Sequence, residues 1–145
     1  MKNFLNIIKE IALWIWQFPQ NIVGLITLAI MGYEKVLTAE NGNKIYFSKK
    51  MSGGISLGKY SIISDYYIRR VSTDTSILDL DVTRHEALGH GKQSRWLGPF
   101  YLPIVGLQSI IWAGLYGSVI PYTYNGYYKF WTERWADKLG GITRN

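Results

Sequence analysis

Two histidines and a glutamate lie close together in the segment Arg84–His90, which reads RHEALGH, and the 145-residue chain has no other histidine. A hydrolytic zinc site needs neutral imidazoles as ligands, an open coordination position for water, and a carboxylate that accepts the proton of that water. His85 and His90 can supply the imidazoles and Glu86 the carboxylate. The segment therefore predicts a mononuclear zinc site with His85 and His90 as ligands and Glu86 as the general base.

The spacing of the two histidines constrains the helix that carries them. Zinc-binding histidines on a regular helix are four residues apart, because residues i and i+4 share a face. His85 and His90 are five positions apart, which places them roughly 140° apart around a straight helix. One π-bulge absorbs one extra residue and returns the two rings to the same side. We therefore expect an irregular turn here, which Gly89 makes easier.

Two carboxylates follow much later in the chain. Glu133 and Asp137 are the only acidic residues after Glu86, and their four-residue spacing places them on one face of a helix. An isolated carboxylate among aromatic residues costs free energy unless it is paired or bound to a metal. The alternative is a solvated face on which both carboxylates pair with the basic residues nearby, Lys129, Arg134 and Lys138.

These motifs resemble those of the gluzincin metallopeptidases. HEALGH resembles the HExxxH variant of dipeptidyl peptidase III, whose histidines bind zinc and whose glutamate is the base. TERWAD, residues 132–137, resembles the gluzincin ExxAD segment. The resemblance implies that Glu133 is the third zinc ligand and that Asp137 hydrogen-bonds the outer nitrogen of a ligand histidine, fixing its tautomer.

A second resemblance covers roughly the C-terminal half of the chain. HEALGHGKQSRWLGPFYLPIVGL and FWTERWADKLGG are similar to small bacterial proteins with the patterns HExGHxxQSxxLGPLYL and EKWADKLGG, in which the histidines are four residues apart. This resemblance implies a bacterial protein with a minimal zincin-like core. In the gluzincin clan a strand before the zinc helix docks the substrate by β-pairing, so the resemblance assigns that role to residues 55–64.

The surrounding sequence predicts an α+β fold, a mainly helical single domain with a small sheet or hairpin before the zinc helix. Residues 1–36 are expected to form an apolar helical segment and residues 37–145 the metallopeptidase core. The N-terminal half is expected to form two helical pieces within residues 3–36, broken at Pro19, and then strands over Lys44–Ser48 and Ile55–Ser64. A polar loop leads to Asp81, which is expected to be the N-cap of a helix that ends at about Leu97. The last expected element is a helix over Tyr128–Leu139, which Gly140 and Gly141 end.

Residues 96–128 carry no charged side chain, which makes this stretch a candidate for membrane insertion. A single crossing would place His90 and Glu133 on opposite sides of about 30 Å of hydrocarbon, where they could not share one ion. We therefore expect a buried helical hairpin, a re-entrant loop or an apolar lip in the membrane interface. The tyrosines at its end, Tyr122, Tyr124, Tyr127 and Tyr128, are candidates to stabilise an oxyanion or to fill the core.

Composition narrows the class of partner. The formal charge is +6 with 16 Lys and Arg, but these occur singly or in pairs and form no stripe, which disfavours nucleic acid and suits a surface of anionic lipid. The chain has no cysteine, which excludes disulfides, thiolate metal sites and a cysteine nucleophile. Lys2 and Lys9 precede an apolar stretch without a convincing cleavage site for a signal peptide, so the expected location is membrane-associated or cytoplasmic.

The sequence thus predicts a zinc metallopeptidase that hydrolyses a peptide or protein substrate, with a membrane surface as a further partner. Two alternatives stay open. One is a protein that binds zinc without catalysis, in which the five-residue spacing displaces Glu86. The other is a membrane-associated structural or interaction protein without metal.

Overall fold

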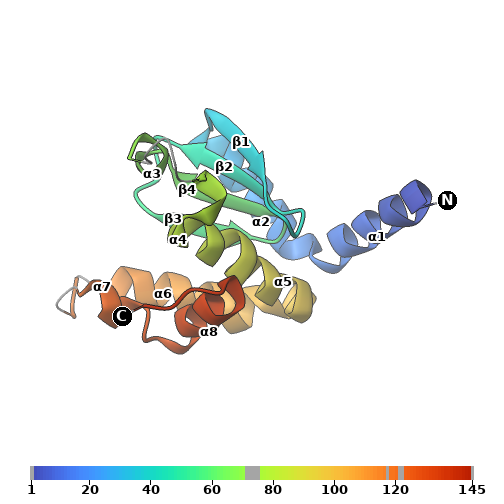
Figure 1. Cartoon of the computed structure of the whole chain (residues 1–145). Coiled ribbons are helices and arrows are strands. Elements are labelled where there is room, and N and C mark those ends of the chain that lie inside the picture. The colour runs from blue at the N-terminus through green and yellow to red at the C-terminus, as the bar shows by residue number, and fades with distance from the viewer. Residues whose placement is uncertain (1, 71–75, 117, 121–122, 145) are drawn as a thin grey trace.

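The chain consists of two N-terminal helices, a small sheet, and a helical C-terminal half, as Figure 1 shows for the computed structural model. The structure describes residues 2–70, 76–116, 118–120 and 123–144. The helices are α1 (Lys2–Trp16), α2 (Phe18–Met31), α3 (Tyr66–Arg69), α4 (Asp81–Thr83), α5 (Gly91–Leu97), α6 (Leu107–Leu115), α7 (Tyr124–Tyr127) and α8 (Trp131–Gly140). Four further turns are the 3₁₀ turns η1 (Ile77–Asp79) and η3 (Gly98–Phe100) and the π-helical η2 (Arg84–His90) and η4 (Leu102–Gly106). The predicted α+β fold, with a small sheet before the helix that carries the histidines, is confirmed.

The strands are β1 (Lys35–Thr38), β2 (Lys44–Ser48), β3 (Gly54–Leu57) and β4 (Tyr60–Ser64), arranged in the order β1-β2-β4-β3. β2 and β4 are parallel, and the two outer pairs are antiparallel. β2 has the predicted bounds, and the predicted strand over Ile55–Ser64 is a hairpin that turns at Gly58, whose φ of 67° favours glycine. β1 was not predicted. β3 lies at one edge of the sheet.

The core lies between the sheet and the helix that carries the histidines. Ile45, Phe47 and Ile63 are fully buried and pack against Ala87 and Leu88 of η2. Apolar residues alternate along β2, so one face of the strand is turned to the helix. The packing fixes the height of η2 above the sheet.

The helix that carries the histidines runs without a break from Asp81 to Leu97, through α4, η2 and α5. Its predicted extent is confirmed, but the prediction that Asp81 caps it is wrong. Leu80 occupies the cap position with extended φ and ψ, and Asp81 is the first helical residue. An acidic residue there is still favourable, because it faces the positive end of the helix dipole.

The N-terminal helices break earlier than predicted. The break falls at Gln17, and α1 and α2 meet at 85°. Pro19 lies in the first turn of α2, where its missing N–H costs no helical hydrogen bond. The final helix, α8, begins later than predicted, at Trp131, and it ends as predicted, with Gly141 in the left-handed conformation at φ 69°.

Polar side chains join α2 to the rest of the molecule. Gln17 and Gln20 donate hydrogen bonds to the Ser94 hydroxyl on α5, and Gln20 also donates to the Gly98 carbonyl. Asn21 donates to the Trp14 carbonyl and accepts from the Lys59 backbone N–H. The three polar residues that interrupt the apolar N-terminal sequence are therefore fully buried.

The charge-free stretch after Trp96 folds back along the molecule through η3, η4 and α6. α6 has no buried residue, so of the three expected forms the buried helical hairpin does not fit, and the re-entrant loop and the apolar lip stay open. Among the described residues no single helix is long and apolar enough to cross a membrane, although two bent pairs, Asn3–Trp16 with Phe18–Met31 and Asp81–Phe100 with Leu102–Leu115, meet the length and composition together. Pro121 and Tyr122 lie outside the described residues.

We expect Asn21→Ala to destabilise the fold by about 2 kcal/mol, because the Trp14 carbonyl and the Lys59 N–H would lose their buried partner. The measurement is urea unfolding followed by circular dichroism. Thr27→Ala on the same helix is the control, since its hydroxyl only bonds back to the Val23 carbonyl, and it should change stability by less than about 0.5 kcal/mol. Equal effects of the two substitutions would contradict the bridging role of Asn21.

Candidate metal centre

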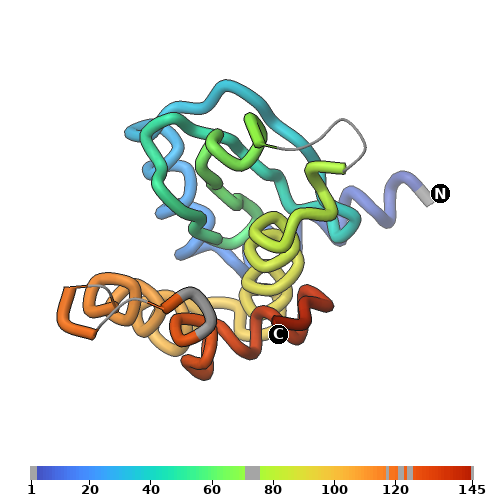
Figure 2. The backbone as a smooth tube through the Cα atoms, turned by 60° about the vertical axis from the view of Figure 1, so that its left-hand side comes forward, coloured from blue at the N-terminus to red at the C-terminus, as the bar shows by residue number. Residues whose placement is uncertain are grey.

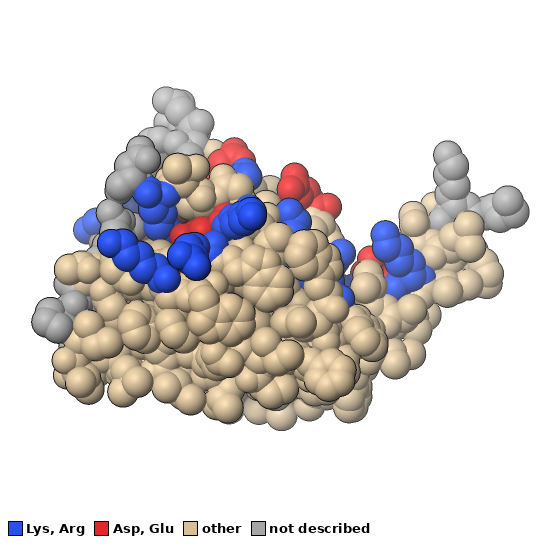
Figure 3. All heavy atoms as spheres, turned by 90° about the horizontal axis from the view of Figure 1, so that it is seen from below, with Lys and Arg blue, Asp and Glu red and all other residues tan. Residues whose placement is uncertain are grey.

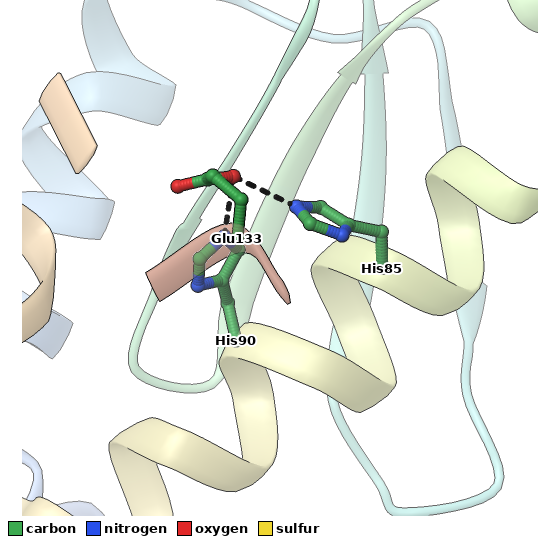
Figure 4. A group of neighbouring side chains, drawn as sticks. All are labelled: His85, His90 and Glu133. Atoms are coloured by element: carbon green, nitrogen blue, oxygen red, sulfur yellow. Dashed lines mark hydrogen bonds and ion pairs between the residues drawn. The ribbon is translucent and has the colours of Figure 1, made fainter. Parts of the chain in front are cut away.

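The turn η2 is π-helical over Arg84–His90, which confirms the predicted irregular turn. The extra residue per turn offsets the five-residue spacing, and both imidazoles leave the helix on the same side (Figure 4). Their ring centroids are 4.8 Å apart with an interplanar angle of 88°. The sequence departure from the four-residue spacing is thus absorbed by the backbone.

Gly89 has a role that the sequence did not indicate. A Cβ at this position would lie 2.4 Å from the Ala136 carbonyl oxygen on α8. Because glycine has no side chain, α8 can approach η2, and this pair of elements is closely packed along its length. The approach carries Glu133 and Asp137 to the histidines.

The carboxylate of Glu133 points between the two imidazoles (Figure 4). Its Oε2 lies 3.1 Å from His85 Nε2 and 3.5 Å from His90 Nε2. Four ligands about 2.05 Å from a tetrahedral ion are about 3.3 Å from one another. The two distances bracket that value, and the three ligand atoms all lie within 4.8 Å of each other. This buried cluster can hold a metal ion.

Each imidazole also has a hydrogen-bond partner at its Nδ1 atom, the ring nitrogen that does not face Glu133. His85 Nδ1 lies 2.7 Å from Asp137 Oδ1, and His90 Nδ1 lies 2.7 Å from Gln93 Oε1. A proton on Nδ1 that is donated to these oxygens leaves both Nε2 atoms to face the cluster. The resemblance implies this place for Asp137, whereas Gln93 was not predicted. Its position three residues after His90, on the same side of the helix, was the available signal.

Asp137 has a second partner at the C-terminus of the chain. Arg144 Nε and Nη2 donate to Asp137 Oδ2 and Oδ1 at 2.7 and 2.9 Å, and the guanidinium stacks on the Tyr128 ring. Tyr128 in turn packs edge-on against the His85 imidazole. The alternative of Glu133 and Asp137 on a solvated face is therefore wrong, since both carboxylates are buried.

Charge is concentrated inside this cluster. Burial lowers the pKa of His85, but its bonds to Asp137 and Glu133 outweigh that and raise the pKa to about 9. Burial raises the pKa of Glu133, but hydrogen bonds from the two imidazoles hold it well below its ordinary range. Without a metal ion, His85 is therefore an imidazolium and Glu133 a carboxylate at neutral pH. A cation that binds here must displace the proton from His85.

Glu86 lies beside the cluster without a fixed partner for one oxygen. Burial raises the pKa of its carboxyl, and Glu86 Oε2 has no hydrogen-bond partner among the described residues. Gly54 of β3 approaches so closely that a Cβ there would lie 2.5 Å from Glu86 Oε1. A buried carboxylate oxygen in this state is suited to accept a hydrogen bond from a bound water or ligand.

The cluster opens into a cavity of about 190 Å³ that Glu86, His90 and Glu133 line together with β3 and α6. Tyr101, which was not predicted, also lines it and donates a hydrogen bond to the Ser56 carbonyl at 3.0 Å. Of the predicted tyrosines, Tyr127 lines the cavity and Tyr128 packs against His85. Tyr122 and the side chain of Tyr124 lie outside the described residues.

Comparison of the chain with models of protein families, with curated proteins and with solved structures gives no match. The resemblance of the motifs to the gluzincins therefore stays a prediction. The geometry of His85, His90 and Glu133 is what supports a metal site.

We expect purified protein to hold about one metal ion per chain, and His90→Ala and Glu133→Ala to lose it, because each substitution removes one of three ligands. Mass spectrometry of the metal content after dialysis against buffered zinc measures this. Glu40→Ala is the control, since Glu40 is exposed and outside the cluster. Metal retained by both ligand variants would refute the site.

We also expect zinc affinity to rise with pH. The raised pKa of His85, about 9, means that binding releases one proton at any pH below it, so affinity should weaken about tenfold per unit as pH falls. Competition with a chelator from about pH 6.5 to about pH 8.5 measures the slope, and Asp137→Asn should flatten it because Asp137 raises the pKa of His85. A pH-independent affinity of the wild type would contradict the coupled proton.

Proposed function

We propose that the chain is a zinc-dependent metallopeptidase. The observation that carries the proposal is the convergence of three buried ligand atoms, from His85, His90 and Glu133, beside a carboxylate, Glu86, that lines the same cavity. Two nitrogens and one oxygen are a donor set that suits zinc, and three protein ligands leave a fourth position open. Bound zinc would supply a Lewis acid and a water of lowered pKa.

Glu86 is the general base in this proposal. Its buried carboxylate accepts a proton from the water, and it then delivers that proton to the nitrogen of the leaving amine. Burial raises its pKa, which makes the carboxylate a stronger base than one in solvent. The Ser56 hydroxyl donates to the Glu86 carbonyl at 2.7 Å, which holds η2 against β3.

β3 is the proposed docking strand for the substrate. Only β3 of the predicted region 55–64 lies at a sheet edge, because β4 pairs on both sides. In an antiparallel pair both backbone groups of a residue point to the same side, and the Ser56 carbonyl points away from β4 toward Tyr101. Gly54, two residues earlier, turns its backbone groups to that same edge, next to Glu86. An extended peptide that pairs there passes the general base.

Glu86→Gln should keep its zinc and lose at least about 100-fold in peptide hydrolysis, because the amide cannot accept the proton of the water. The assay uses a library of internally quenched peptides with zinc-loaded protein, and Glu40→Gln is the control of equal charge change at an exposed site. Hydrolysis that survives in Glu86→Gln would remove the general-base role.

The same assay separates the alternatives. Zinc-loaded wild type that cleaves no peptide would favour a metal protein without catalysis. A wild type that takes up no zinc would favour the structural or interaction protein and would overturn the proposal.

A further inference from the structure

The polarity of α2 is inverted relative to a helix of a water-soluble protein. Its buried residues are Gln20, Asn21, Gly24 and Leu28, whereas most of its apolar side chains lie elsewhere on the helix. Ile26 and Ile30 are 54% and 65% exposed. Soluble helices bury the apolar face and expose the polar one. α2 therefore has its apolar side on the surface of the molecule.

α6 continues this surface. None of its residues is buried, and Leu107, Ile110 and Ile111 are each more than half exposed. The two helices meet, since Val23 and Thr27 of α2 line one groove together with Leu107 and Ile110. We define the apolar face by six exposed side chains of the two helices, Val23, Ile26, Ile30, Leu107, Ile110 and Ile111.

The apolar face lies in a broad surface free of charge. Residues 11–33 and 96–128, which include α2 and α6, contain no Asp, Glu, Lys or Arg. In Figure 3, the charged side chains lie along the upper margin of the molecule, and the lower, larger part of the view shows uncharged atoms only. Single monomers rarely expose an apolar patch of this kind without a partner that covers it.

A row of indoles lies against α6, and a lysine lies at the end of α2. Trp96, Trp135 and Trp131 follow one another with ring centroids 6.2 and 6.4 Å apart, and Trp131 donates to Gln108 on α6. Lys50 donates to the Ile30 carbonyl, which holds an exposed ammonium at the end of the apolar stripe of α2. Tryptophan and lysine side chains are both suited to the headgroup region of a membrane, because each joins an apolar part to a polar end.

We propose that the apolar face rests on an anionic lipid bilayer and that the cavity of the metal centre takes its substrate from the membrane side. The net charge of +6 complements anionic headgroups. A protein that lies in the membrane–water interface typically combines an apolar face with basic side chains that contact the headgroups. A second copy of the chain would cover apolar residues equally well, but it would not be attracted by this charge or need the row of indoles.

The substrate half of the proposal rests on the proposed peptidase. The groove between α2 and α6 lies beside the cavity, because Ile55, Leu57, Gly106 and Ile110 line both. The cavity is therefore adjacent to the apolar face. An apolar, extended segment of a membrane-bound protein can reach Glu86 along β3 without leaving the lipid surface.

The test is flotation of metal-free protein with vesicles of phosphatidylcholine and phosphatidylglycerol. Wild type should float with the vesicles, and Ile26→Glu combined with Ile111→Glu should weaken binding by at least about tenfold, because two carboxylates would face anionic lipid. Tyr66→Glu on α3 combined with Val36→Glu on β1 is the matched control, since it adds the same two carboxylates at exposed residues outside the apolar face. Circular dichroism confirms that both variants fold.

Two outcomes overturn the docking half. One is wild type that stays monomeric and does not float. The other is wild type that forms a stable dimer, does not float, and becomes monomeric in the double variant, which would make the apolar face an interface between copies.

A second measurement tests the substrate half with zinc-loaded protein. One apolar peptide is presented either free or attached to a lipid in the vesicles, and wild type should cleave the attached form faster, whereas the double variant should lose this difference. Flotation without cleavage of either form refutes the peptidase and leaves the docking intact. Equal cleavage of both forms refutes delivery from the membrane.

Discussion

The close approach of α8 to the π-helical turn η2 is the contact on which the metal centre depends. Five residues separate the histidines, and only the wider π-turn brings their rings to one side. The same turn places Gly89 against the Ala136 carbonyl, where any side chain would push α8 away. Because α8 carries Glu133, one backbone irregularity and one glycine together determine whether the three ligand atoms can meet.

The cluster also has an electrostatic constraint. A buried carboxylate such as Glu133 is costly unless a positive charge faces it. Without metal, that charge is the proton on His85, which Asp137 also attracts. A bound cation would take over this role and release the proton. Arg144 supports the arrangement from outside, because its bidentate contact keeps Asp137 ionised and oriented. A positive charge thus faces the Glu133 carboxylate both with and without a bound metal ion.

Residue types and spacing predicted the two histidines, Glu86 and the π-turn, whereas the places of Glu133 and Asp137 were implied by the resemblance of the motifs to the gluzincins. The sequence also predicted β2 and the extent of the helix over residues 81–97. It missed β1 and Tyr101, since their roles come from tertiary contacts that no local pattern records. It also missed Gln93, although the position of Gln93 three residues after His90 was a local signal.

The polar residues Gln17, Gln20 and Asn21 also have roles that depend on tertiary contacts and that the sequence did not predict. In the sequence they only interrupt an apolar run. In the fold their side chains are fully buried, because hydrogen-bond partners await them on α5 and at the turn between β3 and β4. These side chains are buried because they find hydrogen-bond partners, not because they are apolar. No local pattern distinguishes a polar residue that will be buried with partners from one that will be exposed to solvent.

The inverted polarity of α2, whose polar side chains are buried and whose apolar side chains are exposed, links the apolar face to the metal centre. Gln17 and Gln20 bond to Ser94, which lies four residues after His90 on the same continuous helix, and those bonds turn the polar side of α2 inward. Once that side is inward, Ile26 and Ile30 have to face out. α2, which lies against the body while α1 projects from it in Figures 1 and 2, is therefore oriented by the same helix that holds the histidines. A surface that binds the apolar face fixes the direction from which the cavity is approached.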